Sequence, residues 1–304
     1  MRITNKMLHA NFMQNLDRNK FYLEKLHNRI ASGKMVNRPS DDPVVVSRVM
    51  TIRTALDEME QFDKNMRDAM SWLEISENSL GNLTNVLQRA RELAVYGAGG
   101  TLTTKAMAAL ADEVKQLIEE VTQIANNTHG DAYIFGGNYT TKPPFELKNN
   151  SGTLEIEYKG DFAKIQYEVS PGVNMTINAS QNAFQLYEEG GEIKSKVYET
   201  LIELVQMMRS GDASGISNRL GEMDAIIDGV LSERASLGAK SNRMETALQR
   251  SLNSQYEFTR ILSRLEDTDY ARAMIDFSVQ EAAYHAAIKS GSQILQPTLL
   301  DFLK

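Results

Sequence analysis

Residues 45–94 read VVSRVMTIRTALDEMEQFDKNMRDAMSWLEISENSLGNLTNVLQRARELA. Alternating steps of four and three residues from Val45 meet an apolar side chain at eleven of fifteen positions, which is the spacing of one helical face. Asp42 can cap such a helix, Pro43 suits its first turn, and the glycines between 97 and 100 can end it. The stretch therefore predicts one long helix with a narrow apolar stripe, as in bundles and coiled coils.

The second half of the chain repeats this pattern. The same steps taken from Ile216 to Leu265 again meet eleven apolar residues in fifteen. Shorter helices are expected over about 103–127 and 193–209. Proline, which breaks helix interiors, is absent from 44–142 and from 172–296. We therefore expect two helical halves that pack together as a bundle.

The block from about 138 to 180 has a different period. Apolar and polar residues alternate there, which is the spacing of strands, and turn-forming pairs such as Pro171-Gly172 separate the runs. The apolar members are Leu154, Ile156, Tyr158, Ile165, Tyr167, Val169, Val173, Met175 and Ile177. The predicted fold class is mainly α with a small β insert, built on a rod-like bundle of long helices.

Composition argues against several classes of protein. The 304 residues include 33 Lys and Arg against 40 Asp and Glu, and the net charge of −7 argues against a nucleic-acid partner. No run approaches the roughly 18 apolar residues of a membrane span. The first twenty residues lack the apolar segment of a cleaved secretory signal. The absence of cysteine excludes disulfides, thiolate zinc sites and cysteine nucleophiles.

No sequence motif indicates catalysis, metal binding or cofactor binding. The glycine-rich segment 97–106 lacks the Gly-Lys-Ser/Thr of a phosphate loop and fits a turn between helices. The four histidines show no metal-ligand spacing. Asp41 and Asp42 suit helix capping, and Asp267 and Asp269 suit hydrogen bonds or ion pairs. We expect no catalytic residue, no metal and no cofactor.

The two ends of the chain differ from the predicted bundle. Residues 1–33 carry a weaker apolar stripe, and residues 270–296 are rich in alanine, which buries little area. Isolated helices of this kind are marginal in water. We expect both ends to be largely unfolded in the free monomer and to order on assembly.

Three segments carry a family resemblance. Residues 23–43, LEKLHNRIASGKMVNRPSDDP, resemble the amino-terminal signature of bacterial flagellins. Residues 263–295, which begin SRLEDTDYA, resemble the carboxy-terminal signature, and 234–243 resemble the stretch before it. Pro43 after the two aspartates, IFGGNYTTKPPF at 134–145 and the ending QPTLLDFLK are closer to hook–filament junction members of this family than to its filament proteins.

The resemblance implies a layered, secreted subunit of the extracellular flagellum. Residues 1–42 and 266–304 would form an inner coiled-coil layer, 43–137 and 181–265 the helical bundle, and 138–180 an outer β domain. Such a subunit is exported through the type III channel. Its implied partners are itself in a helical homo-oligomer, the hook-side junction protein, flagellin and a cytoplasmic export chaperone.

Candidate assembly residues lie in both ends and beside the signatures. Arg29, Arg38, Arg264 and Arg272 could pair with the nearby aspartates of the same or a neighbouring subunit. The candidates are Phe12, Leu16, Leu23, Leu26, Ile30, Arg38, Asp41, Asp42, Arg264, Asp267, Asp269, Tyr270, Ile275, Val279, Ala282, Ala286, Leu295, Leu299 and Phe302.

Three other functions stay open at this point. A short filament flagellin would form filaments by itself. An adhesin-like or signalling rod would bind host receptors, and an enzyme would show hydrolytic or transferase activity in the purified protein.

Overall fold

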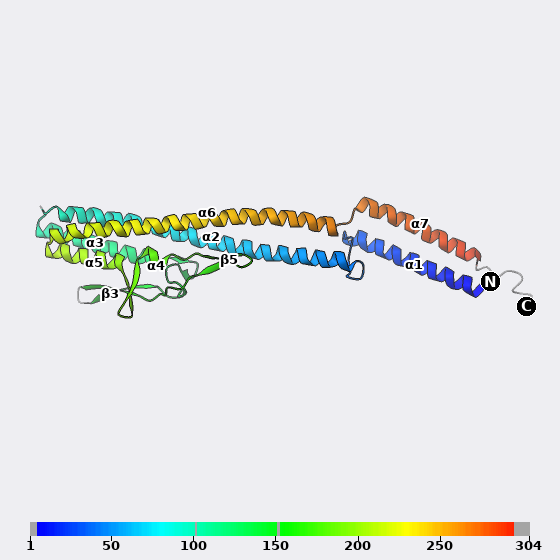
Figure 1. Cartoon of the computed structure of the whole chain (residues 1–304), viewed down its shortest axis with the longest axis horizontal. Helices are drawn as coiled ribbons and strands as arrows, with labels where there is room; N and C mark the ends of the chain where they lie inside the picture. The colour runs from blue at the N-terminus through cyan, green and yellow to red at the C-terminus, as the bar shows by residue number, and fades with distance from the viewer. Residues whose placement is uncertain (1–4, 101, 151–152, 295–304) are drawn as a thin grey trace, which may run out of the picture. The chain divides into compact units, whose positions relative to one another are not determined.

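The computed structural model describes residues 5–100, 102–150 and 153–294 (Figure 1). The chain forms two compact units, one of residues 1–58 and 253–304 and the other of residues 59–252. The division falls within two long helices, α2 (Pro43–Ala98) and α6 (Ala213–Glu266), which each continue from one unit into the other. The mainly α fold with long helices predicted from the sequence is confirmed.

The unit of residues 59–252 is a helical bundle with hairpins. Helices α3 (Thr104–Ala125) and α5 (Lys196–Ser210) lie along α2 and α6 (Figure 1). The predicted stripe forms its core, because Met66, Leu73, Leu80 and Leu87 are all at most 2% exposed. The helix boundaries also follow the expected local signals. Asp42 Oδ1 accepts hydrogen bonds from the N–H groups of Val44 and Val45, and α2 ends before the glycine turn.

Three of the polar residues that interrupt the α2 stripe, and one that interrupts the α6 stripe, have partners. Glu77 and Arg234, which both occupy stripe positions, form an ion pair of 2.7 Å between α2 and α6. The stripe residue Arg91 pairs with Asp224 at 2.5 Å. Thr84 is buried and donates its hydroxyl hydrogen to the Leu80 carbonyl. The two ion pairs join α2 to α6 in addition to the apolar burial between them.

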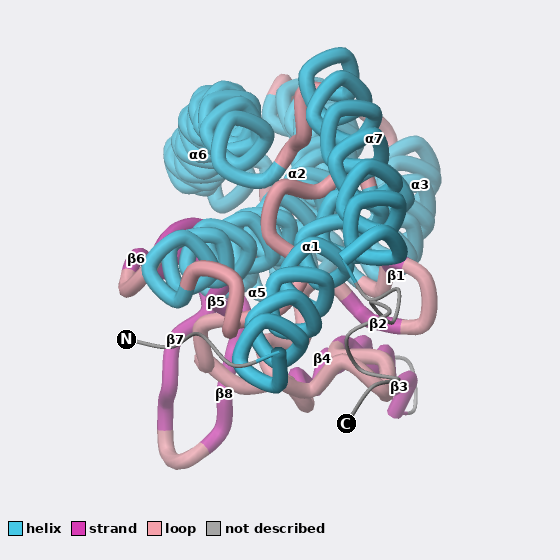
Figure 2. The backbone as a smooth tube through the Cα atoms, turned by 90° about the vertical axis from the view of Figure 1, so that its right-hand side faces the viewer, coloured by secondary structure: helices cyan, strands magenta, loops and turns pink. Residues whose placement is uncertain are grey.

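The β structure consists of four separate antiparallel hairpins within the described residues, outside the helices of this unit (Figure 2). They are β1 (Thr128–His129) with β2 (Ala132–Tyr133), β3 (Phe145–Asn150) with β4 (Thr153–Tyr158), β5 (Gln166–Ser170) with β6 (Val173–Thr176), and β7 (Leu186–Glu189) with β8 (Glu192–Ser195). Strands thus extend beyond the predicted 138–180. The helix expected from 193 begins at Lys196 because the preceding residues form β8.

An aromatic cluster joins the hairpins to the bundle. Phe145 contacts the rings of Tyr158, Phe184 and Tyr198 at centroid distances of 4.9, 4.9 and 5.4 Å. Phe135, from the segment 134–145, packs edge-on against Phe184 at 5.1 Å. The Tyr158 hydroxyl donates to the Phe135 carbonyl. The 134–145 motif is therefore a structural fastening of the β insert.

Gly137 tests this fastening. Its φ is +67°, and a Cβ there would lie 2.0 Å from Oδ1 of Asp161. Gly172 has a similar φ of +72° but open space around it. We expect Gly172→Ala to lower the free energy of unfolding by about 1 kcal/mol through backbone strain alone, and Gly137→Ala by at least about twice as much. Chemical denaturation measures both. Equal effects would contradict the fastening role.

Candidate assembly interface

The two ends of the chain form an antiparallel helix pair, called here the terminal pair. It consists of α1 (Asn5–Ser32) and α7 (Tyr270–Ile294), which lie side by side (Figure 1). The buried or half-buried face of α7 repeats at helical spacing through Ala273, Phe277, Gln280, Tyr284, Ala287 and Gly291. The matching face of α1 runs through Phe12, Leu16, Asn19, Leu23, Leu26 and Ile30.

Three contacts define how these faces meet. Gly291 leaves room for the Phe12 ring, because a Cβ at Gly291 would lie 2.0 Å from the ring. The Gln280 amide donates to Asn19 Oδ1 at 3.4 Å. The rings of His27 and Phe277 lie 6.4 Å apart. The α1 candidates Phe12, Leu16, Leu23, Leu26 and Ile30 therefore share the face that packs on α7 within the chain, where each stays half-buried.

The α7 candidates lie on the other side of that helix. Ile275 and Val279 are both 64% exposed, and Ala282 and Ala286 are exposed beside them. At 3.6 residues per turn, this outer face is roughly opposite the face that contacts α1. Met274 and Tyr270, more than half exposed, lie near its amino-terminal end. Helix α7 therefore has apolar or small residues on two faces, and the terminal pair covers one of them.

A second feature, called here the clasp, joins Gly33–Met35 to Glu266–Thr268. The N–H of Met35 donates to the Glu266 carbonyl at 2.6 Å, and the N–H of Thr268 donates to the Gly33 carbonyl at 2.9 Å. Lys34 and Asp267 form an isolated antiparallel bridge between these bonds. Gly33, with φ +71°, ends α1 and lies against the Tyr270 hydroxyl. The two signature segments thus meet in space.

The carboxylate of Glu266 is the charged centre of the clasp. Its side chain is 8% exposed, accepts a hydrogen bond from Lys34 at 2.5 Å and also pairs with Arg53 of α2. Burial raises the pKa of Glu266, but the hydrogen bonds from Lys34 and Arg53 outweigh burial, so its pKa lies below the ordinary value. Two cations therefore hold this carboxylate ionised where three segments converge.

The four signature aspartates have local partners. Asp41 pairs with Lys25 at 3.0 Å and accepts from the backbone of Asn37 and Arg38. Asp42 and Asp269 cap α2 and α7, and Asp267 accepts from Ser263. The expected ion pairs between these aspartates and Arg29, Arg38, Arg264 or Arg272 do not occur within the described chain. Instead, these carboxylates accept hydrogen bonds from backbone N–H groups, Lys25 and Ser263.

The sequence patterns did not single out Lys34, Arg53 or Glu266. Glu266 lies far along the chain from both cations, and charged side chains are usually solvated. Of the predicted residues, Leu295, Leu299 and Phe302 lie outside the described part of the chain. The remaining candidates stay a prediction for contacts between copies.

No described helix combines the length and the apolarity that crossing a membrane requires. Over the same residues, no group of three or more histidine, aspartate or glutamate side chains is arranged to hold a metal ion.

The fold is that of a long-helix structural protein whose amino- and carboxy-terminal helices pair with each other. Residues 3–140 match the family model of the bacterial flagellin N-terminal helical region, and residues 220–303 match that of the C-terminal helical region. The chain belongs to the bacterial flagellin family, a family of structural flagellar proteins.

Individual relatives refine this placement. Flagellar hook-associated protein 3 of Salmonella typhimurium is 24% identical over 308 residues, which cover 95% of this chain and 96% of that protein. A flagellin of Bacillus subtilis is 26% identical and covers 91% of both chains. The crystal structure of the flagellar junction protein of Legionella pneumophila shares the fold, with a TM-score of 0.57 at 17% identity, over 74% of this chain and 100% of that one.

Gly291→Ala tests the packing of the terminal pair. The new Cβ would drive the Phe12 ring out of its place, which we expect to destabilise the pair by about 1–2 kcal/mol. Amide exchange across residues 12–30 measures the loss of protection. Gly238→Ala, in a helix with open space around it, is the control and should stabilise slightly. Unchanged exchange in Gly291→Ala would contradict the described contact.

Glu266→Gln tests the clasp. Because the pKa of Glu266 is lowered on folding, its contribution to stability is complete above about pH 5 and is lost as the pH falls below about 4.3. At neutral pH we expect Glu266→Gln to reduce amide protection at Met35 and Thr268 about tenfold, or about 1.4 kcal/mol. The same variant should abolish this acid-dependent change. Glu257→Gln, in an exposed pair with Arg260, is the control and should match the wild type.

Proposed function

We propose that this chain is the non-enzymatic subunit that joins the hook-side junction protein to the flagellin filament. Its place would be the extracellular hook–filament junction. Support comes from the relative named flagellar hook-associated protein 3, which aligns over nearly the whole of both chains. The observation that carries the mechanism is the exposed outer face of α7.

An uncovered apolar face suits repeated contacts between copies. A contact between two different surfaces generates tubes and helices when it does not close on itself. Covering Ile275 and Val279 would contribute about 1–2 kcal/mol each, which accumulates over many subunits. In this proposal residues 1–42 and 266–304 form the inner layer, and the terminal pair that one chain already makes gains its full stability on assembly. Residues 43–137 and 181–265 set the lateral spacing, and residues 138–180 face outward.

Other proposed contacts extend this surface. Tyr270 is exposed, as are Arg38 and Arg264, whose guanidinium groups make no ion pair within the described chain. They can therefore reach aspartates of a neighbouring copy, of the hook-side junction protein or of flagellin. Before export, the outer face needs a partner that prevents aggregation, and a small cytoplasmic chaperone would serve this purpose.

A short filament flagellin is the second candidate. The similarity to the flagellin of Bacillus subtilis over 91% of both chains favours it. A filament subunit forms long filaments by itself, whereas a junction subunit does not. Purified filaments composed of this protein would support the flagellin alternative.

Deletion of the gene tests the junction role. A strain without this protein should make hooks that lack filaments and should shed flagellin into the medium. The reason is that flagellin would have no subunit at the end of the hook on which to assemble. Electron microscopy and analysis of culture supernatants provide the measurement. Intact filaments on the deletion strain would exclude the junction role.

Val279→Asp tests the outer face. Val279 is 64% exposed, so the variant monomer should melt at the wild-type temperature. A carboxylate buried between copies is costly, so complementation of the deletion strain should fall by at least about tenfold in filament number. Val173→Asp, at the exposed first residue of β6, is the matched control and should restore filaments. Full complementation by Val279→Asp would show that the outer face of α7 is not a contact between copies.

A further inference from the structure

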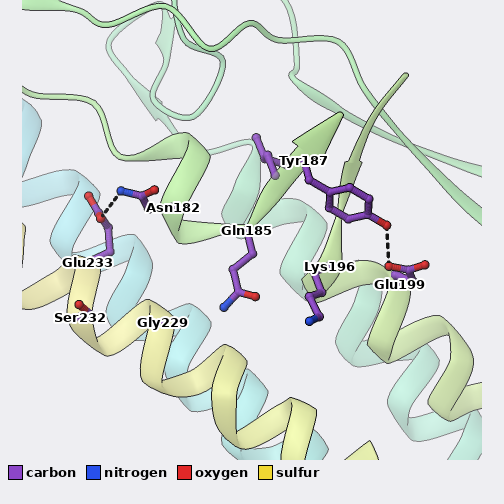
Figure 3. Close-up of a pocket in the computed structure, with 9 residues that line it drawn as sticks. Asn182, Gln185, Tyr187, Lys196, Glu199, Gly229, Ser232 and Glu233 are labelled. Carbon is purple, nitrogen blue, oxygen red and sulfur yellow. Dashed lines mark hydrogen bonds between the residues drawn. The ribbon is translucent and has the colours of Figure 1, made fainter. Parts of the chain in front are cut away.

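A groove of about 720 Å³ opens in the unit of residues 59–252 (Figure 3). It lies between the turn that joins α4 (Ser180–Ala183) to β7, the start of α5 and the middle of α6. Its polar lining includes Asn182, Gln185, Tyr187, Lys196, Glu199 and Glu233. The volume is in the range of small-molecule sites.

One wall of the groove is held in a strained conformation. Gln185 has φ +46°, and it is the one non-glycine residue of the described chain in the left-handed region. Its amide points toward α6 at Gly229 (Figure 3), where any Cβ would lie 2.5 Å from Nε2. Strain of about 1–3 kcal/mol persists only where the surroundings impose it. The surrounding contacts therefore hold the backbone of Gln185 in this conformation.

Glu233 is a buried carboxylate without a cation. The residue is 7% exposed, lines the groove and accepts a hydrogen bond from the neutral amide of Asn182 at 3.0 Å. Within the described residues it forms no ion pair. A buried charge that has only a neutral partner is costly, and a cation entering the groove would remove that cost.

The opposite wall adds acceptors and an aromatic ring. The Tyr187 hydroxyl donates to Glu199 at 2.8 Å (Figure 3). Carboxylates, the side-chain carbonyl of Gln185 and a phenol ring are groups that interact favourably with a guanidinium or an alkylammonium group. Lys196 is the opposing cation in the lining. Residues 59–252 also carry 27 acidic against 18 basic side chains, so the surrounding field attracts cations.

We propose that this groove binds a guanidinium or alkylammonium group, with Glu233 as its counter-ion. The group can belong to a free diamine or to a basic side chain of a second copy. The site does not depend on the junction role, because binding is measured on the soluble chain. Failure of either proposal leaves the other intact.

Titration of the full chain with agmatine, a guanidinium without a carboxylate, tests the proposal. Calorimetry gives the affinity, and amide chemical shifts should change around residues 182–187 and 229–233. We expect Glu233→Gln to weaken binding at least tenfold, Lys196→Met to strengthen it, and Glu192→Gln, which removes a charge outside the groove lining, to leave it unchanged. Equal binding by Glu233→Gln and wild type, or shifts confined to other residues, would overturn the proposal. Absence of binding by the wild type would do the same.

The source of the cation is settled by sedimentation of the same proteins. Self-association that agmatine inhibits and Glu233→Gln abolishes would assign the groove to a basic side chain of a second copy. Agmatine binding by a chain that stays monomeric would assign it to a free cation. Either result supports the site. Should Glu233→Gln fold poorly, the shift map of the wild type still decides whether agmatine occupies the groove.

Discussion

A helix with apolar residues on two opposite faces cannot bury both against a single partner helix. Helix α7 is in this position, because α1 covers the face of Phe277 and Gly291 while Ile275 and Val279 stay largely in water. The hydrophobic effect is proportional to the area removed from water, so the uncovered face retains a driving force for further association. The proposed assembly of copies depends on this imbalance.

The clasp fixes the start of α7, and so the outer face of this helix, beside the end of α1. Its backbone bonds join the end of α1 to the start of α7, and the Glu266 carboxylate draws Lys34 and Arg53 to the same point. The unit of residues 59–252 is stabilised differently, by a closed core that includes Leu80, Leu83 and Ile118. This core is buried within a single chain. The unit of residues 59–252 thus has a closed core, whereas the outer face of α7 stays exposed within one chain.

Local patterns were sufficient for the long elements. The apolar stripes, the Asp42 cap and the glycine turn after α2 each depend on residues within a few positions of one another, so short-range physics predicts them. The hairpins at 128–133 and 186–195 were missed because two- to four-residue strands give almost no periodic signal. The clasp and the groove were missed because their members, such as Lys34 with Glu266 or Gln185 with Gly229, are distant in the chain.

The order of residues alone established a mainly helical protein with a β insert, flagellin-like signatures at both ends and no cysteine chemistry. It also marked the stripe of Ile275, Val279, Ala282 and Ala286, since helical periodicity is a property of the chain itself. Only the folded structure decided which face of α7 is covered by α1 and which carboxylates are buried. The pairing of α1 with α7 and the burial of Glu266 depend on the packing of segments more than 200 residues apart, and a local pattern contains no information about such partners.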